Sequence, residues 1–241
     1  RDRRIDPHTY SLVNLRVAIA NHPANNLRMI EIHRPANSLE HTKVIADDLG
    51  AILREGDTVK LIGEMGAGKT TFVRMLAQSF GINENAVSSP TFVIMNIYER
   101  EDGRPPLAHL DCYRLGDESE LDALGWDQII DRGAIILIEW PDRIADALPA
   151  ECLTIRIDHV DETARDFHFE IPDSWIDRAG FDAIRPRPAT TCPTTGVSVR
   201  GDSLTWPFAS ERARMADLNA WFDEKHTISR PIKQTDIELG D

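Results

Sequence analysis

Residues 63–71, Gly-Glu-Met-Gly-Ala-Gly-Lys-Thr-Thr, decide the fold of this 241-residue chain. They match the pattern Gly, four residues, Gly-Lys-Ser/Thr, in which successive backbone N–H groups turn inward around phosphate oxygens. Lys69 supplies a positive charge to the β and γ phosphates, and the Thr70 hydroxyl is placed to bind Mg²⁺. The loop therefore predicts a site for a nucleoside triphosphate. The predicted nucleotide-binding residues are Gly63, Glu64, Met65, Gly66, Ala67, Gly68, Lys69, Thr70 and Thr71.

The segments on both sides of this loop support a phosphate site. Residues 57–62 are largely apolar and rich in β-branched side chains, which is typical of a buried parallel strand. Apolar residues from Phe72 to Phe80 recur at helical spacing, and Gly81 is a natural end for that helix. A strand, a glycine-rich loop and a helix in this order favour a nucleotide site over a chance match in a turn.

The composition fits a globular protein and argues against several function classes. A hydrophobic fraction of 41% and a charged fraction of 28% are ordinary for a soluble domain. The formal charge of −13 argues against a broad basic surface for DNA or RNA, although an RNA substrate could be reached through a partner. The three cysteines lack metal-ligand spacing, no apolar run is long enough to span a membrane, and no secretory signal is evident. We expect a cytoplasmic protein with reduced thiols.

The rest of the pattern predicts an α/β fold with flanking segments. Residues 1–36 mix charged residues, Asn and Pro, and we interpret them as an extension outside the nucleotide core. The composition shifts again after residue 183, where Pro and Thr are typical of a linker. Helices are predicted over 39–53, 117–124 and 210–225, and further strands over 93–98, 107–112, 134–138, 153–157 and 167–171. The last two strands alternate apolar and polar residues, as half-exposed antiparallel strands do.

The sequence also predicts how the helix over 39–53 begins and which residues form the apolar faces of the helices over 39–53 and 210–225. Asn37 and Glu40 have the spacing of a capping box at the start of the helix over 39–53. The apolar face of that helix would include Leu39, Ile45, Leu49, Ile52 and Leu53. The helix over 210–225 would be amphipathic, and its apolar face would include Met215, Leu218 and Phe222.

A phosphate site of this type also needs a carboxylate near Mg²⁺, at the end of a neighbouring buried strand. Asp111 ends the strand that begins at Leu107, and Glu139 ends the strand over 134–138. Both strand ends could face the loop, because ligands in such sheets bind beyond the carboxyl ends of the strands. Either residue could hold Mg²⁺ or orient the attacking water, and either could instead be a capping or salt-bridged acid.

Three nearby residues have both functional and structural interpretations. Residues 89–91 could sense the γ-phosphate through the Thr91 hydroxyl, or could form a simple proline turn. His109 lies two residues before Asp111, but one His and one Asp make a poor transition-metal site, so a packed strand histidine is favoured. Trp140 could stack on a base, whereas a partly buried aromatic at a strand end is the simpler interpretation.

Four motifs in this order resemble the TsaE family, the bacterial ATPase subunit needed to make threonylcarbamoyladenosine in tRNA. The resemblance covers about residues 37–172, and the last three motifs are more specific than the phosphate loop. The motifs are the loop with its following Phe at 63–72, Ser-Ser-Pro-Thr-Phe at 88–92, His-Leu-Asp-Cys-Tyr-Arg-Leu at 109–115, and Ile-Glu-Trp-Pro-Asp-Arg at 138–143.

The resemblance implies a P-loop domain over residues 37–172, with a mostly parallel sheet that antiparallel strands extend and helices flank. It implies that Lys69 and Thr70 hold the phosphates of ATP and Mg²⁺, that Asp111 is a metal-site carboxylate, and that Glu139 is the acid most needed for hydrolysis. The implied catalytic residues are Glu139, Lys69 and Thr91, and the implied metal ligands are Thr70, Asp111 and Glu139.

The family also implies further residues and partners. Thr91 would lie in a switch-like segment, and Thr42 would lie near the nucleotide. The ATPase would be slow alone and would act through a complex of TsaD and TsaB, in which TsaD transfers the threonylcarbamoyl group to tRNA. The acidic composition is compatible with such a role, since the tRNA need not touch this chain and no DNA or membrane partner is implied.

Two regions depart from the family, and two other functions stay open. Residues 1–36 and 173–241 exceed the usual family length, and residues 173–180 faintly resemble the segment that leads into a fused phosphotransferase domain. The remaining tail is too short for a kinase fold, so we interpret it as a remnant or a partly disordered extension. The alternatives to the ATPase are a P-loop kinase for a small acceptor, and a binding module that uses ATP only to hold a complex together.

Overall fold

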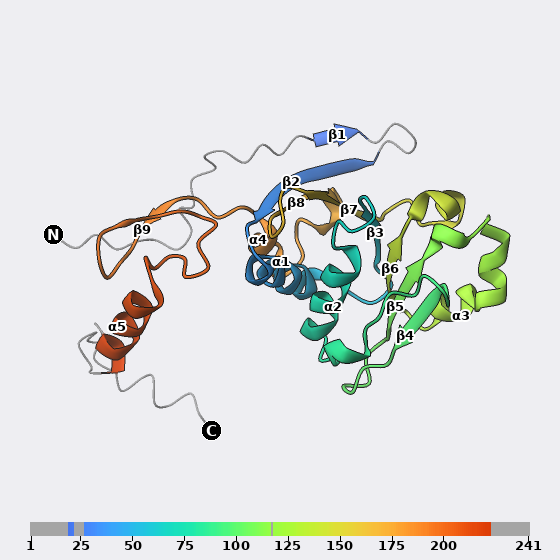
Figure 1. The fold of residues 1–241 in the computed structure, drawn as a ribbon, viewed down its shortest axis with the longest axis horizontal. Helices are drawn as coiled ribbons and strands as arrows, with labels where there is room; N and C mark the ends of the chain where they lie inside the picture. The colour runs from blue at the N-terminus through green and yellow to red at the C-terminus, as the bar shows by residue number, and fades with distance from the viewer. Residues whose placement is uncertain (1–18, 22–26, 117, 223–241) are drawn as a thin grey trace, which may run out of the picture. The chain divides into compact units, whose positions relative to one another are not determined.

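The computed structural model describes residues 19–21, 27–116 and 118–222, and the chain divides into two compact units, residues 1–186 and 187–241. The first unit is built on an eight-stranded mixed sheet with the strand order β1-β2-β8-β7-β3-β6-β5-β4 (Figure 1). The predicted α/β fold is therefore confirmed. The strands are β1 (Ile19–Asn21), β2 (Arg28–Ala36), β3 (Thr58–Ile62), β4 (Met95–Tyr98), β5 (Leu107–Asp111), β6 (Ile135–Glu139), β7 (Leu153–His159) and β8 (Arg165–Pro172).

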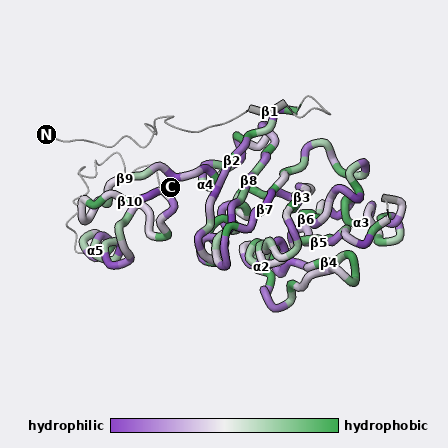
Figure 2. The backbone as a smooth tube through the Cα atoms, turned by 45° about the horizontal axis from the view of Figure 1, so that its top comes forward, coloured by the Kyte–Doolittle hydropathy of each residue, from purple (hydrophilic) through white to green (hydrophobic). Residues whose placement is uncertain are grey.

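Four neighbouring strands, β7, β3, β6 and β5, run parallel and form the centre of the sheet. Every residue of β5 and β6 is buried, and both strands carry mainly hydrophobic residues (Figure 2). Such runs are typical of parallel strands that are covered on both faces. The register pairs Leu61 with Glu139 and Glu139 with Asp111, so the carboxyl ends of three parallel strands meet at one edge of the sheet.

Two helices, α1 (Leu39–Ile52) and α2 (Lys69–Ser79), lie side by side against one face of the sheet (Figure 1). On the opposite face, α3 (Trp126–Asp131) packs against β5 and β6 together with the 3₁₀ segments η3 (Glu118–Leu124) and η4 (Pro141–Ala147). The strands β5 and β6 are thus enclosed between two layers. No helix within the described ranges is long and apolar enough to cross a membrane. Shorter segments are η1 (Glu84–Ala86), η2 (Cys112–Arg114), η5 (Asp173–Trp175) and α4 (Phe181–Ile184).

Both flanking segments contribute to the first unit. Residues 28–36, which the sequence placed with an N-terminal extension, form β2 and pair with β8 along its length. Residues 173–186, placed with the C-terminal extension, bury Trp175, Phe181 and Ile184 in the main core. The Arg34 guanidinium fixes the second segment, because its Nη1 donates to the carbonyl oxygens of Ala183 and Ile184 at 3.1 and 3.0 Å. These parts of the two predicted extensions therefore belong to the sheet and its core.

Several predicted details of the first unit are wrong. Helix α1 is capped by Ser38, not Asn37, because the Ser38 hydroxyl accepts from the His41 N–H at 3.3 Å. Leu39 is 59% exposed, since at the first turn it lies outside the buried stripe. The strand expected from residue 93 begins at Met95, because residues 91–93 form a turn. The strand β7 is antiparallel to β8, as expected, but it is also parallel to β3.

The second unit is small, and its described part covers residues 187–222. It holds a hairpin of β9 (Thr190–Thr191) and β10 (Ser198–Val199), followed by helix α5 (Glu211–Phe222). Its core contains Cys192, Val199 and Ala213. The helix was predicted, but its buried residue is Ala213, whereas the predicted face of Met215, Leu218 and Phe222 is exposed. Residues 223–225 of the predicted helix lie outside the described residues.

Candidate functional site

The phosphate loop joins the end of β3 to the start of α2, as the sequence predicted. Gly66 and Gly68 adopt left-handed backbone angles, with φ of 83° and 103°, and Gly68 precedes the first residue of the helix. Gly63 is required for space, because a Cβ there would lie 2.6 Å from the Ile157 carbonyl oxygen on β7. Arg165 of β8 donates from Nε to the Ala67 carbonyl oxygen at 2.8 Å. The loop is therefore held from the antiparallel strands as well as by its own turn.

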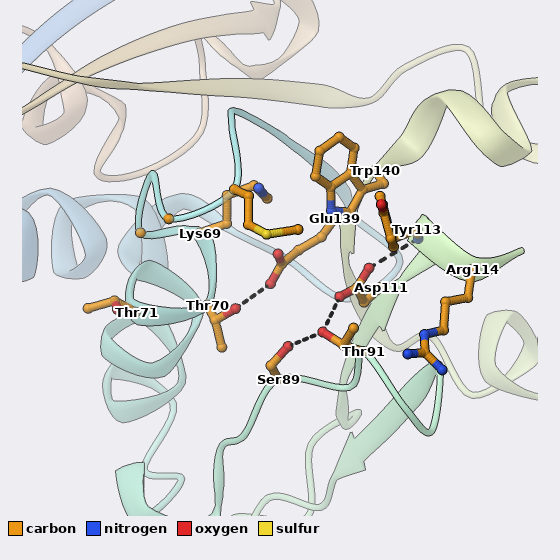
Figure 3. Close-up of a pocket in the computed structure, with 13 residues that line it drawn as sticks. Lys69, Thr70, Thr71, Ser89, Thr91, Asp111, Tyr113, Arg114, Glu139 and Trp140 are labelled. Carbon is orange, nitrogen blue, oxygen red and sulfur yellow. Dashed lines mark hydrogen bonds between the residues drawn. The ribbon is translucent and has the colours of Figure 1, made fainter.

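The loop opens on a pocket of about 470 Å³ at the carboxyl ends of β5 and β6 (Figure 3). Nine of the predicted site residues line it: Met65, Gly66, Gly68, Lys69, Thr70, Thr71, Thr91, Asp111 and Glu139. The lining also contains Ser89, Tyr113, Arg114 and Trp140. Four predicted residues are not among the lining residues: Thr42, Gly63, Glu64 and Ala67. The structure thus brings the loop, both candidate carboxylates and the switch-like segment to one place.

Lys69 is held at the pocket by the loop itself. Its Nζ donates to the carbonyl oxygens of Gly63 and Glu64 at 2.8 and 3.0 Å, and it lies 4.7 Å from the centre of the Trp140 ring. Burial lowers the pKa of the ammonium group, while the carboxylates of Glu139 and Asp111 oppose that shift. Glu64 therefore contacts Lys69 through its backbone oxygen, and the Trp140 ring presents an aromatic face to the ammonium group.

Glu139 is connected to the loop and to a buried histidine. Its Oε1 accepts from the Thr70 hydroxyl at 2.8 Å and lies 3.0 Å from Nε2 of His109. Since an ionised carboxylate only accepts, the histidine donates from Nε2, and its buried Nδ1 has no partner among the described residues. Burial alone would raise the pKa of Glu139, but the hydrogen bonds from His109 and Thr70 and the charge of Lys69 outweigh it, so the pKa is lowered.

Asp111 is connected to the switch-like segment. Its Oδ2 accepts from the Thr91 hydroxyl at 2.7 Å, and its Oδ1 accepts from the Tyr113 backbone N–H at 3.1 Å. The Ser89 hydroxyl lies 2.6 Å from that of Thr91, and because Thr91 gives its proton to Asp111, Ser89 donates to Thr91 (Figure 3). The segment before β4 is therefore hydrogen-bonded to the carboxylate at the end of β5.

Thr42 lies on a different element and is tied into its own helix. It is buried at the start of α1, and its hydroxyl donates to the Ser38 carbonyl oxygen at 3.2 Å. This bond is the common local use of a threonine in a first helical turn. The structure therefore shows no pocket contact for Thr42.

The structure adds functional candidates that the sequence assigned to packing. His109 is fully buried as expected, but it also contacts the carboxylate of Glu139. A sequence signal existed, because His109 and Asp111 are two residues apart on one strand and therefore share a face of the sheet. The rings of Tyr113 and Trp140 lie 5.2 Å apart, and the Arg114 guanidinium lies 4.5 Å from the Phe92 ring. These contacts bring η2 and the switch-like segment to the rim of the pocket.

The family model for the threonylcarbamoyl adenosine biosynthesis protein TsaE matches residues 36–167, which include every residue placed in this site. The chain belongs to the TsaE family. It is 42% identical over 130 residues to the TsaE protein of Bacillus subtilis, covering 54% of this chain and 79% of that relative. It is also 42% identical over 118 residues to the TsaE protein of Streptomyces coelicolor, covering 48% of this chain and 78% of that relative.

The chain is also similar to a solved structure and to a second family model. A crystal structure of YdiB from Bacillus subtilis covers 61% of this chain and 88% of its own, with 31% identity and a TM-score of 0.49. A second family model, the DNA gyrase inhibitor YacG, matches residues 190–238, a segment that continues beyond the described residues. The TsaE match is thus confined to the first unit, and the YacG match to the second.

Proposed function

We propose that this TsaE-family chain binds ATP with Mg²⁺ and hydrolyses it slowly, as the energy-coupling subunit that serves tRNA threonylcarbamoylation in the cytoplasm. The observation that carries the proposal is the position of Glu139, which accepts from Thr70 of the loop and lies next to Asp111 in the sheet. A carboxylate joined to the loop threonine is what an NTPase needs to place a metal ion and a water molecule at the γ-phosphate.

The residues present fit Mg²⁺. Thr70, Asp111 and Glu139 offer a hydroxyl and two carboxylates, the hard oxygen ligands that this ion prefers. Both hydrogen bonds to Glu139 fall on Oε1, which leaves its Oε2 available to the ion or to water. Bound Mg²⁺ supplies positive charge that offsets the charge of the phosphates during transfer.

The chain's own residues would do the rest of the chemistry. Lys69 exchanges the carbonyl oxygens of Gly63 and Glu64 for phosphate oxygens, which are stronger acceptors. Glu139, kept ionised by its hydrogen bonds, orients the attacking water and accepts its proton. The Thr91 hydroxyl carries changes at Asp111 to the exposed segment that follows it.

A partner is also part of the proposal. Beside the pocket, Met65, Phe92 and Val93 are exposed apolar residues, with exposures of 78%, 81% and 59%. A protein that covered them would also press on the segment that carries Thr91. We propose that a TsaD–TsaB complex is this partner, and that the tRNA is reached through it and not by this acidic chain.

ATP hydrolysis by the purified chain, alone and with TsaD, TsaB and tRNA, tests the proposal. We expect slow turnover that rises with the partners and is lost in Lys69→Ala. Turnover that ignores the partners would contradict the coupling role. Phosphate transfer to a metabolite faster than to water would support the P-loop kinase instead. Equal complex function from wild type and Glu139→Gln would support a module that only binds ATP.

The second unit has a separate candidate function, which the YacG match supports. We propose that the segment over residues 190–238 binds DNA gyrase. The test adds the full chain to purified gyrase and measures supercoiling, with a chain ending at Pro186 as the control. Inhibition by the full chain alone supports the proposal, and equal supercoiling with both chains would contradict it.

A further inference from the structure

The antiparallel part of the sheet carries a cluster of imidazole and carboxylate groups outside the phosphate pocket. Strands β2, β8 and β7 are neighbours, and the side chains of His33, Asp166 and His168 occupy alternate positions on one face of them. The face is accessible, because His33 is exposed and the other two residues are half-buried. The opposite face of the same strands packs on the main core.

Backbone pairing fixes the positions of these groups. His33 of β2 lies directly opposite His168 of β8, and their rings stack with centres 4.6 Å apart. Nε2 of His33 lies 3.3 Å from Asp166 Oδ1, and Nε2 of His168 lies 3.2 Å from Asp158 Oδ2 on β7. Directly opposite side chains in an antiparallel pair have Cβ atoms about 5 Å apart, so the ladder holds the two imidazoles within reach of one ion.

We propose that His33, Asp166 and His168 form a binding site for a divalent transition metal ion such as Zn²⁺. One ligand atom from each of the three residues lies within 4.8 Å of the other two. Metal–ligand bonds of about 2.0–2.2 Å place the ligand atoms of a tetrahedral zinc ion about 3.3–3.6 Å apart, so modest side-chain rotation closes the site. Two imidazoles and one carboxylate are a known zinc ligand set, with a fourth position left to water.

The ligand types distinguish this site from the phosphate pocket. Imidazole nitrogen favours zinc, copper and nickel, whereas the hydroxyl and carboxylates of Thr70, Asp111 and Glu139 favour magnesium. Asp158 adds a second carboxylate next to the cluster, and its charge is shared with Arg156, which lies 3.7 Å from it. Outer carboxylates of this kind orient metal-binding histidines.

A bound ion would join β2 to β8 across the sheet. The strand β2 follows a segment outside the described residues and is held mainly by its ladder with β8, so a metal cross-link adds stability to the folded state alone. Any ion that binds the folded chain and not the unfolded chain raises the Tm by mass action. The site thus predicts a thermal shift that does not depend on ATP hydrolysis.

The experiment titrates the tag-free chain with Zn²⁺ by calorimetry at about pH 7.5, where an ordinary imidazole is neutral. Excess Mg²⁺ is present to occupy the oxygen ligands of the phosphate pocket. We expect one Zn²⁺ per chain and a higher Tm with zinc, both lost in His33→Ala and in His168→Ala. The matched control is His159→Ala, which also removes an exposed imidazole from β7. His159 follows Asp158 directly in the strand, so its side chain lies on the face opposite the histidine cluster.

Two results would overturn the site. Absence of zinc binding by the wild-type chain would show that the cluster is an ordinary network of surface ion pairs. Zinc binding that survives in the His33→Ala/His168→Ala double variant would place the ion elsewhere in the chain. Both histidines lie on the accessible face, so circular dichroism of the variants is expected to match that of the wild type.

Discussion

The parallel and antiparallel halves of the main sheet differ in where their charged side chains lie. In the parallel half, Lys69, His109, Asp111 and Glu139 are all buried and each contacts another polar group of the phosphate pocket. In the antiparallel half, most charged side chains of β2, β8 and β7 alternate with core residues and face outward. Arg34 and Arg165 are exceptions, because they bond to Asp48 and to the Ala67 carbonyl oxygen on the core side. Helices cover both faces of the first half but only one face of the second.

This contrast indicates at which positions the loss of a charged group should have a large effect. A buried charge loses its water and depends on fixed partners, so removing one partner leaves the other unpaired. An exposed ion pair is screened by solvent, and its loss changes the free energy of unfolding by no more than about 1 kcal/mol. Equal charge changes are therefore expected to have large effects at the pocket and small effects on the outer face.

The largest effect is expected for Lys69→Ala. The change removes the cation from the triphosphate, so ATP affinity falls and kcat falls by at least about 10²–10³-fold. Nucleotide binding by calorimetry and phosphate release measure the two losses. Lys43→Ala is the control, because Lys43 is a half-buried lysine of α1 that pairs with Asp47 and does not line the pocket. Unchanged ATP binding and turnover in Lys69→Ala would contradict the site.

The next largest effect is expected for Glu139→Gln. The amide keeps the size of the side chain but cannot accept a proton, so kcat should fall about 10²–10³-fold while ATP affinity stays close to that of the wild type. Single-turnover kinetics and nucleotide titration separate these quantities. The matching change on the outer face is Glu170→Gln, an exposed residue of β8 that should leave both unchanged. A Glu139→Gln chain that hydrolyses ATP normally would exclude the assigned role.

A smaller effect is expected for a change that keeps Glu139 and removes its hydrogen bond with His109. His109→Phe deletes the donor to Glu139, and a hydrogen bond to a charged group contributes about 1.5–3 kcal/mol, so kcat should fall about 10–100-fold at unchanged KM. His109→Gln restores a neutral N–H donor and should recover part of the loss. If the two variants are equally impaired, His109 contributes packing alone.

The His109→Phe change should also alter the pH dependence of kcat. The hydrogen bond from His109 helps to lower the pKa of Glu139, so its contribution to stability is present above the ordinary carboxyl pKa and is lost as pH falls through the lowered value. In His109→Phe the pKa of Glu139 rises, and the acid limb of kcat should move to higher pH. Identical pH profiles of the wild type and His109→Phe would contradict this coupling.

Local patterns made the loop and the strand-end carboxylates that line the pocket predictable from the sequence. The loop's glycines, Lys69 and Thr70 are each required by the phosphate chemistry, and the apolar run of β6 identified Glu139 as a strand-end carboxylate. The hydrogen bonds that join Glu139 to Thr70 and His109 were not predictable, because they join β6 to residues of α2 and β5 that are 69 and 30 positions away in the sequence. Thr42 shows the converse, since a family position near the nucleotide has no pocket contact here.

The margins of the sheet were harder to predict. The strand β2 contains several charged residues and Pro35, so its sequence resembled a polar extension although Met29, Ile30, Ile32 and Ala36 are buried. Its pairing with β8 joins residues 129 to 143 positions apart, from Ala36–Arg165 to Met29–Pro172, and no local signal encodes such a contact. The helix α5 was found because helical periodicity is local, whereas its buried face was set by a small core of Cys192, Val199 and Ala213.

The smallest effect is expected for Arg156→Ala, which tests the outer half directly. Arg156 is half-exposed and lies 3.7 Å from Asp158, so the free energy of unfolding should change by no more than about 0.5 kcal/mol and ATP turnover should not change. Urea denaturation and phosphate release measure the two quantities. A loss of several kcal/mol would mean that the outer face is covered and its charges are desolvated. The two halves would then follow the same rule, since burial, and not the type of charged residue, decides how much each ion pair contributes.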